Sequence, residues 1–335
     1  MASSAASSAK FVLALIVAAC AIFAVGRLIG NSYAFFLGYV VVQYIVLGTA
    51  WNILGGYTGY VNFGVTAFFA IGAYSTVALY KLAPATPLPV MIAIGGAFAA
   101  LVGLGTGYLT LRLRGVFFSI ATLALAVVVQ TLITNWEFVG GARGAYVLRP
   151  KLAPLMGGEY VQYLFVLMLG LCVIVLATAR AIERSSLGYG FAAIRDDEAA
   201  AEAAGVPTLK LKLIACGLSG ALMCVAGAPN PMFQQYAIPS AVFDLNYSVY
   251  ALAMSLIGGT AHWIGPVIGA VVLSSTQQIV GVTISSELNV LVLGVMLVMF
   301  VIVAPDGIIG WFRRKPRTAA EPAATAEPVA PGARS

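Results

Sequence analysis

The sequence predicts an all-α polytopic membrane protein: a bundle of about 8–10 transmembrane helices with glycine-rich broken segments. Two observations lead to this fold class. Of the 335 residues, 61% are hydrophobic and only 9% are charged, whereas a soluble domain carries about 25% charged residues. The mean hydropathy is +0.97, and the apolar residues gather in long runs. A soluble fold would lack the polar residues to cover its surface, so one bundle in a lipid bilayer is expected.

Ten stretches have the composition of a span, which needs about 20 mainly apolar residues. They are 10–29, 33–54, 61–80, 88–110, 115–136, 161–179, 212–235, 246–259, 265–284 and 288–304. The stretch 246–259 is short, and residues 55–60 form a break between two runs. Eight or nine full spans with re-entrant pieces therefore also fit the sequence.

Basic residues mark one side of this ten-span arrangement. They precede the first span, follow the tenth and occupy the loops after spans four and six: Lys10, Arg112, Arg114, Arg180, Arg184, Arg195, Lys210, Lys212, Arg313, Arg314, Lys315 and Arg317. Because basic residues gather on the cytoplasmic side of membrane proteins, both termini are expected in the cytoplasm. The net charge of +6 thus reflects orientation, and no nucleic-acid partner is expected.

The sequence offers little that would support catalysis or metal binding. Four cysteines lie in apolar runs, as packing residues do, and His262 is the only histidine. No GxxxxGK[ST] motif for binding nucleotide phosphates is present. No acidic residue falls clearly within a span, which disfavours an ion-coupled carrier, since such carriers bury carboxylates. Neither a metal nor a cofactor is expected.

The longest polar interruption is the loop 185–208. Its stretch "FAAIRDDEAAAEAAG" predicts one short helix, rich in alanine and glutamate and ended by Gly205 and Pro207. Phe191, Ile194 and Ala201 form an apolar stripe on it. The loop is either a solvated connector or a docking helix for a cytoplasmic partner. Its length favours docking, because a connector in a bundle needs only about 2–8 residues.

Four segments in order carry a family resemblance over about residues 35–312. The loop sequence "AIRDDEAAAEAAGV" resembles the coupling loop of LivM-type permease subunits in ABC importers for branched-chain amino acids. "GYTGYVNFGVTAFFAIGAY" resembles that family's early glycine-rich motif, and "LRLRGVFFSIATLALA" with "NWEFVGGARG" resembles its central pair. "LIGGTAHWIGPVIGA" resembles its late Gly-Gly motif.

The resemblance implies an ABC importer permease in the bacterial inner membrane, paired with a second, LivH-type permease. Two ATP-binding cassette ATPase subunits would bind the cytoplasmic loops and hydrolyse ATP, and a periplasmic solute-binding protein would deliver the solute. The permease itself would not be an enzyme. The residues expected to couple it to the ATPase are Arg195, Asp196, Asp197, Glu198, Glu202 and Gly205.

Two glycine-rich breaks, at 55–64 and 258–265, are the predicted substrate pathway, because broken backbone within a bilayer lies inside protein or along a cavity. The first is interpreted as a broken helix that dips into the bundle. The predicted pathway residues are Tyr57, Gly59, Tyr60, Asn62, Gly64, Gly258 and Gly259. The alternative is close helix packing, which small residues also favour.

Three regions are expected: residues 1–34 with the first span, the permease domain 35–312, and a basic, then disordered tail 313–335. The expected solute is a branched-chain or similar small amino acid, with urea, an amide or an organic acid as alternatives. Tyr60, Asn62, Val65 and 260–262 depart from the family's motifs, which leaves the solute open. The alternatives from other functional classes are an ion-coupled secondary carrier or channel and a membrane enzyme.

Overall fold

The computed structural model describes residues 2–110, 113, 115–149, 160–283, 288–304 and 307–313. All ten predicted spans contain a helix. These are α1 (Ala2–Ile29), α2 (Ser32–Gly55), α3 (Val65–Leu82), α4 (Leu88–Thr110), α5 (Val116–Thr134), α6 (Tyr160–Glu183), α9 (Thr208–Gly227), α12 (Asn246–Gly258), α13 (Ile264–Thr283) and α14 (Leu288–Val303). The predicted all-α polytopic fold is confirmed.

Eight segments of the described chain are long and apolar enough to cross a membrane. Six are the helices α1 to α6. The other two are Thr208–Gln234, in which α9 continues into α10 (Asn230–Gln234), and Pro239–Gly258, in which α11 (Pro239–Val242) precedes α12. Helices α13 and α14 contain shorter apolar segments. The chain is therefore a multi-pass membrane protein.

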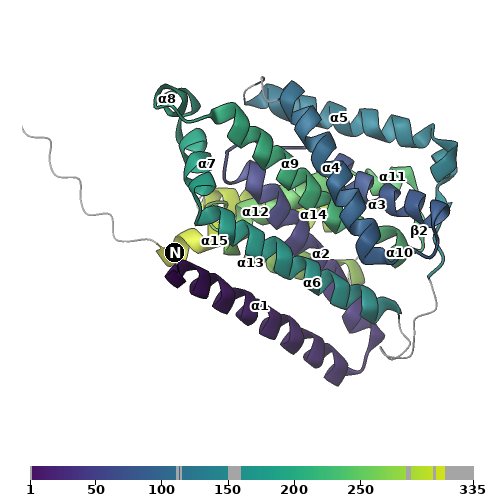
Figure 1. The fold of residues 1–335 in the computed structure, drawn as a ribbon. Helices are drawn as coiled ribbons and strands as arrows, with labels where there is room; N and C mark the ends of the chain where they lie inside the picture. Colours follow the sequence, from purple (N-terminus) through teal and green to yellow (C-terminus); the bar gives the residue numbers. More distant parts are fainter. Residues whose placement is uncertain are drawn as a thin grey trace, which may run out of the picture.

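The bundle has two distinct ends (Figure 1). The start of α1, α15 (Gly307–Arg313) and the pair α7 (Ser186–Asp196) and α8 (Glu198–Ala203) gather at one end, called here the α7–α8 end. At the opposite end lie α10, α11 and β2 (Tyr236–Ala237), which pairs antiparallel with β1 (Ala145–Tyr146). The short 3-10 turns Glu137–Val139 and Gly141–Arg143 precede β1.

Helices α2 and α3 form the centre of the bundle. Every residue from 45 to 55 in α2 and from 65 to 74 in α3 is buried. A helix that is apolar all round is stable only when neighbours surround it, and α2 packs against α6, α9, α12 and α13. The first glycine-rich break therefore joins two enclosed helical segments.

Helix α12 lies beside the second half of α2 and runs in the same direction. The Ser255 hydroxyl donates to the Gly48 carbonyl oxygen at 3.1 Å, and the Asn52 amide donates to the Thr260 carbonyl oxygen at 3.1 Å. With 13 residues, α12 extends about 20 Å, less than the roughly 30 Å hydrocarbon core. The preceding α11 completes the 20-residue apolar segment Pro239–Gly258.

Three boundaries differ from the sequence prediction. Residues 61–64 were expected in a span but precede α3 as non-helical backbone, and 212–235 is divided after Gly227. The predicted single helix in the loop 185–208 is two helices, α7 and α8, separated at Asp197. The proposed division at 1–34 and 35–312 stays a prediction, and the tail beyond residue 313 lies outside the described residues.

Candidate functional site

The α7–α8 segment, residues 186–203, divides because Asp197 caps the second helix. The Asp197 backbone is extended (φ −159°, ψ 109°), and its carboxylate accepts hydrogen bonds from the amides of Ala199 at 2.9 Å and Ala200 at 3.0 Å. An aspartate in this position satisfies amides that have no partner within the helix. The cap fixes the direction in which the next residue, Glu198, leaves the backbone.

The two faces of the α7–α8 segment have different environments. Phe191, Ile194 and Ala201 are buried, which confirms the predicted apolar stripe. Of the six residues predicted to couple to an ATPase, five are exposed to solvent: Arg195, Asp196, Asp197, Glu202 and Gly205. Glu198 differs, since its side chain is only 14% exposed and points into the protein. The four charged residues among these five leave a charged surface at the α7–α8 end.

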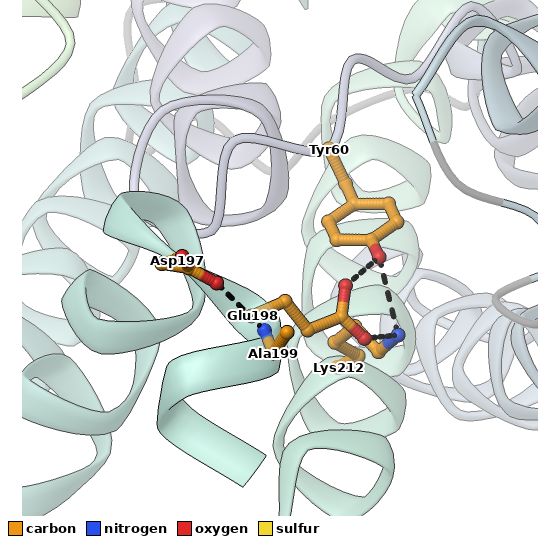
Figure 2. A network of polar contacts seen from close by, with 5 residues as sticks. All are labelled: Tyr60, Asp197, Glu198, Ala199 and Lys212. Atoms are coloured by element: carbon orange, nitrogen blue, oxygen red, sulfur yellow. Dashed lines mark hydrogen bonds and ion pairs between the residues drawn. The ribbon is translucent and has the colours of Figure 1, made fainter. Parts of the chain in front are cut away.

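Glu198 belongs to a buried polar cluster with Lys212 of α9 and Tyr60 of the first break (Figure 2). The Lys212 ammonium lies 2.7 Å from Glu198 Oε1 and 3.2 Å from the Tyr60 hydroxyl oxygen, and that hydroxyl donates to Glu198 Oε2. The Lys212 side chain is 4% exposed and Tyr60 is 8% exposed. Low local dielectric strengthens such contacts.

The Tyr60 ring is fixed in place by two further contacts. It meets the Phe118 ring edge to face, with centroids 5.2 Å apart, and the Lys212 ammonium lies 4.9 Å from its centroid. Edge-to-face aromatic pairs and cation–π contacts both stabilise one orientation of a ring. The Tyr60 hydroxyl is therefore directed at Glu198. The sequence prediction had assigned Tyr60 to the pathway, without this partner.

Beyond Tyr60, the first break is non-helical backbone that enters the bundle and interrupts the helical path between α2 and α3. Side chains supply the hydrogen bonds that a helix would have made internally. On the α5 side, the Ser119 hydroxyl donates to the Val61 carbonyl oxygen at 2.8 Å, and the Phe63 amide donates to the Thr122 hydroxyl at 3.1 Å. On the α12 side, the Ser248 hydroxyl donates to the Phe63 carbonyl oxygen at 2.9 Å.

Asn62 has a local structural role at the start of α3. Its side-chain oxygen accepts from the Gly64 amide at 2.7 Å, and its carbonyl oxygen accepts from the Trp51 indole at 2.9 Å. Asn62 is 1% exposed and Tyr57 is 6% exposed. The structure thus packs both of these predicted pathway residues against protein, and their role in the pathway stays a prediction.

Gly64 approaches another span, α5, as expected, whereas Gly59 approaches α7, which is not one of the predicted spans. A Cβ at Gly59 would lie 3.2 Å from Arg195 Cγ, and a Cβ at Gly64 would lie 3.1 Å from the Thr122 carbonyl oxygen. A cavity of about 400 Å³ borders the break at its α5 side. Its lining residues are Gly59, Tyr60, Val61, Phe63, Gly115, Val116 and Ser119.

The second break, 258–265, is a tight turn at the α7–α8 end. A Cβ at Gly258 would overlap the Gly265 carbonyl oxygen. The Glu183 carboxylate, at the end of α6, accepts from the Trp263 amide at 3.0 Å and lies 3.3 Å from His262 Nε2. For Gly258, the structure thus shows the close packing that was the alternative interpretation. A pathway role for Gly258 and Gly259 stays a prediction.

The structure joins two sets of residues that the sequence kept apart. Gly59 and Tyr60, predicted for the pathway, contact Arg195 and Glu198, predicted for coupling.

Sequence reasoning missed Lys212, which it counted only as an orientation signal. It also missed three hydroxyl side chains: Ser119, Thr122 and Ser248. A lysine just inside an apolar run was a usable signal, since charge in a span implies a partner.

Among the described residues, no three His, Cys, Asp or Glu side chains could hold a metal ion together.

Comparisons with known proteins agree with this architecture. The family model described as "Branched-chain amino acid transport system / permease component" matches residues 33–301. The high-affinity branched-chain amino acid transport system permease protein LivM of Escherichia coli is 29% identical over 293 residues, which cover 79% of this chain and 67% of the relative. The Salmonella typhimurium LivM gives the same identity and the same coverage.

A probable branched-chain amino acid transport permease protein LivH of Methanocaldococcus jannaschii is 25% identical over 265 residues, or 74% of this chain and 82% of that relative. No solved structure matches the chain. The family model spans most of the helical bundle, including both glycine-rich breaks and the α7–α8 segment. The chain therefore belongs to the family of branched-chain amino acid transport system permease components.

Proposed function

We propose that this chain is one membrane subunit of an ATP-driven importer for branched-chain or similar small amino acids. One observation carries the proposal: within a permease fold, a solvent-exposed charged segment directly contacts a non-helical stretch that enters the bundle. ATP-driven movement of an attached subunit at that segment would act on the bundle interior. A ligand bound at one place can thereby shift a two-state element elsewhere.

The proposed partners follow from the two ends of the bundle. At the α7–α8 end, the exposed residues Arg195, Asp196 and Glu202 offer charge to a groove on an ATPase subunit. A second, LivH-type permease would complete the channel, with one ATPase beneath each permease. A periplasmic solute-binding protein would deliver the amino acid at the β2 end.

The proposed location is a bacterial inner membrane with both termini in the cytoplasm. The start of α1, α15 and the α7–α8 segment share one end of the bundle (Figure 1), and the sequence concentrates basic residues there. That shared end would be the cytoplasmic one. ATP hydrolysis would then belong to the attached ATPase subunit, on the side where ATP is available.

The solute assignment rests on the relatives, which are a branched-chain amino acid permease, LivM, and a probable one, LivH. The cavity beside Gly59, Tyr60 and Val61 supports part of the predicted pathway, because it lies where the break meets α5. The proposed route passes along this cavity.

Reconstituted transport tests the proposal. The chain, a LivH-type permease, the ATPase and the binding protein encoded with it are placed in proteoliposomes that contain ATP, and entry of labelled leucine is measured. Uptake should require ATP, the binding protein and both permeases. An ATPase variant without its catalytic base serves as the matched control and should give no uptake. Leucine entry driven by this chain alone without ATP would overturn the proposal.

A further inference from the structure

We infer that Tyr60, Glu198 and Lys212 form a buried coupling link that carries displacement of the α7–α8 segment into the bundle. This inference rests on the proposed function, since it needs an ATPase that moves the segment. The three residues come from three elements: the first break, α8 and α9 (Figure 2). They act as positioning residues, because no contact with solute is required of them.

The burial of the link makes it hard to open during a transport cycle. Lys212 and Glu198 are an ion pair at 2.7 Å, with side chains 4% and 14% exposed. Separating the two groups inside the protein would leave a poorly solvated charge on each side, whereas an exposed pair exchanges its partner for water at little cost. When α8 moves, the favourable course is for Glu198, Lys212 and Tyr60 to move together.

Tyr60 connects this ion pair to the polypeptide that enters the bundle. Its hydroxyl donates to Glu198 and accepts from Lys212, so it bonds to both charges. Hydrogen bonds to charged groups are stronger than those between neutral groups. If the Glu198–Lys212 ion pair only held α8 against α9, it would not need the hydrogen bonds to the Tyr60 hydroxyl.

From Tyr60 the connection continues into two helices. The next residues are bonded through the Val61 carbonyl oxygen to Ser119 and through the Phe63 amide to Thr122, both on α5. The Phe63 carbonyl oxygen is bonded to Ser248 of α12. Three hydrogen bonds hold this short stretch at Val61 and Phe63, so displacement of Tyr60 shifts these contacts. The link therefore joins the α7–α8 segment to α5 and α12 through the four consecutive residues 60–63.

The test is the amount of leucine transported per ATP hydrolysed, measured in the same proteoliposomes. Tyr60→Phe removes one oxygen and keeps the ring on Phe118, and Glu198→Gln removes the charge with little change in shape. Each should lower the ratio at least about tenfold, which is the factor expected for loss of a single hydrogen bond to a charged group; Tyr60→Phe removes two such bonds. For Tyr60→Phe, which leaves the ion pair in place, the yield of assembled complex and its stimulated ATPase rate should remain near those of the unaltered protein.

Two controls separate coupling from general stability. Lys210→Met changes an exposed lysine of the same helix and should leave the ratio unchanged, whereas Lys212→Met should lower it. Where Lys212→Met does not assemble, the combined Glu198→Leu and Lys212→Met variant replaces the pair with apolar side chains, which proteins often tolerate. It should assemble and show the low ratio.

The effects should also be non-additive, because the three residues belong to one network. Tyr60→Phe combined with Glu198→Gln should be no worse than the more severe single change. Unchanged ratios in the single variants, or losses of complex yield with a normal ratio, would overturn the link. Absence of ATP-driven uptake by the unaltered protein would instead overturn the proposed function.

Discussion

Gly59 lies directly against Arg195, and a Cβ at Gly59 would stand 3.2 Å from the Arg195 Cγ. The φ angle of Gly59 is +77°, a conformation that glycine adopts readily and other residues rarely adopt. The turn that begins the first break is thus shaped to fit the end of α7. The α7–α8 segment and the break touch here and again at Glu198 and Tyr60.

Gly59→Ala should therefore lower both stability and transport. The left-handed backbone costs about 1–2 kcal/mol for alanine, and the added methyl group displaces Arg195. Thermal unfolding in detergent and leucine uptake are the measurements. Gly170→Ala is the matched control, because a Cβ at Gly170 meets no atom within 4 Å. Equal behaviour of the two variants would contradict the close fit at Gly59.

Asp197→Ala should loosen α8 by removing its cap. Loss of an aspartate cap costs about 1 kcal/mol, and the amides of Ala199 and Ala200 lose their acceptor. Hydrogen exchange should accelerate at those two amides, with a smaller change in α7. Asp197→Asn keeps an acceptor and should exchange at nearly the original rate. Unaltered protection in Asp197→Ala would show that the cap contributes little.

Reversing the exposed charges should weaken ATPase binding without unfolding the permease. Asp196 and Glu202 are exposed, so Asp196→Lys with Glu202→Lys should change the free energy of unfolding by only about 0.5 kcal/mol. Co-purification of the ATPase with the tagged permease should fall strongly. An intact complex in this double variant would contradict docking at the α7–α8 segment.

Glu198→Lys should behave differently from these exposed reversals. It places a second ammonium group beside Lys212, in a site where the side chains are 4% and 14% exposed. An unpaired buried charge typically costs about 3–5 kcal/mol, so the thermal midpoint should drop as well as transport. A normal midpoint for Glu198→Lys would mean that the site is more hydrated than the structure indicates.

Cysteine labelling tests the orientation. Tyr146 is 77% exposed at the β2 end, and Glu202 is exposed at the α7–α8 end. In a chain without its four native cysteines, Tyr146→Cys should react with an impermeant maleimide from outside the inner membrane. Glu202→Cys should react only after the membrane is permeabilised. The reverse pattern would invert the proposed topology.

The helices were predictable because hydropathy depends on local sequence, and a bilayer sets the length of each span. The division at Asp197 was also readable, since aspartate followed by "EAAAEA" is typical of a capped helix start. Propensity alone had favoured one continuous helix. Alanine on both sides of Asp197 and glutamate after it favour helix, so a prediction from propensity extends one helix through the capping residue.

The buried link was out of reach for a different reason. Tyr60 and Glu198 are separated by 138 positions, and Tyr60 and Lys212 by 152. No periodicity relates residues so far apart, and only the packed bundle brings them together. The glycines at 59 and 64 predicted an irregular backbone, but they do not indicate which groups its amides and carbonyls contact. Hydroxyls of Ser119, Thr122 and Ser248 are those partners, and only the packed bundle places them there.

The non-helical stretch at residues 60–63 also constrains the order in which the protein can be completed during synthesis. The hydrogen-bond partners of its backbone at Val61 and Phe63 include Ser119 and Ser248, and Ser248 is translated 185 residues after Phe63. Until α12 enters the membrane, the Phe63 carbonyl lacks that donor, and a lipid environment supplies none. The centre of the bundle is therefore finished late, after most of the chain has left the ribosome.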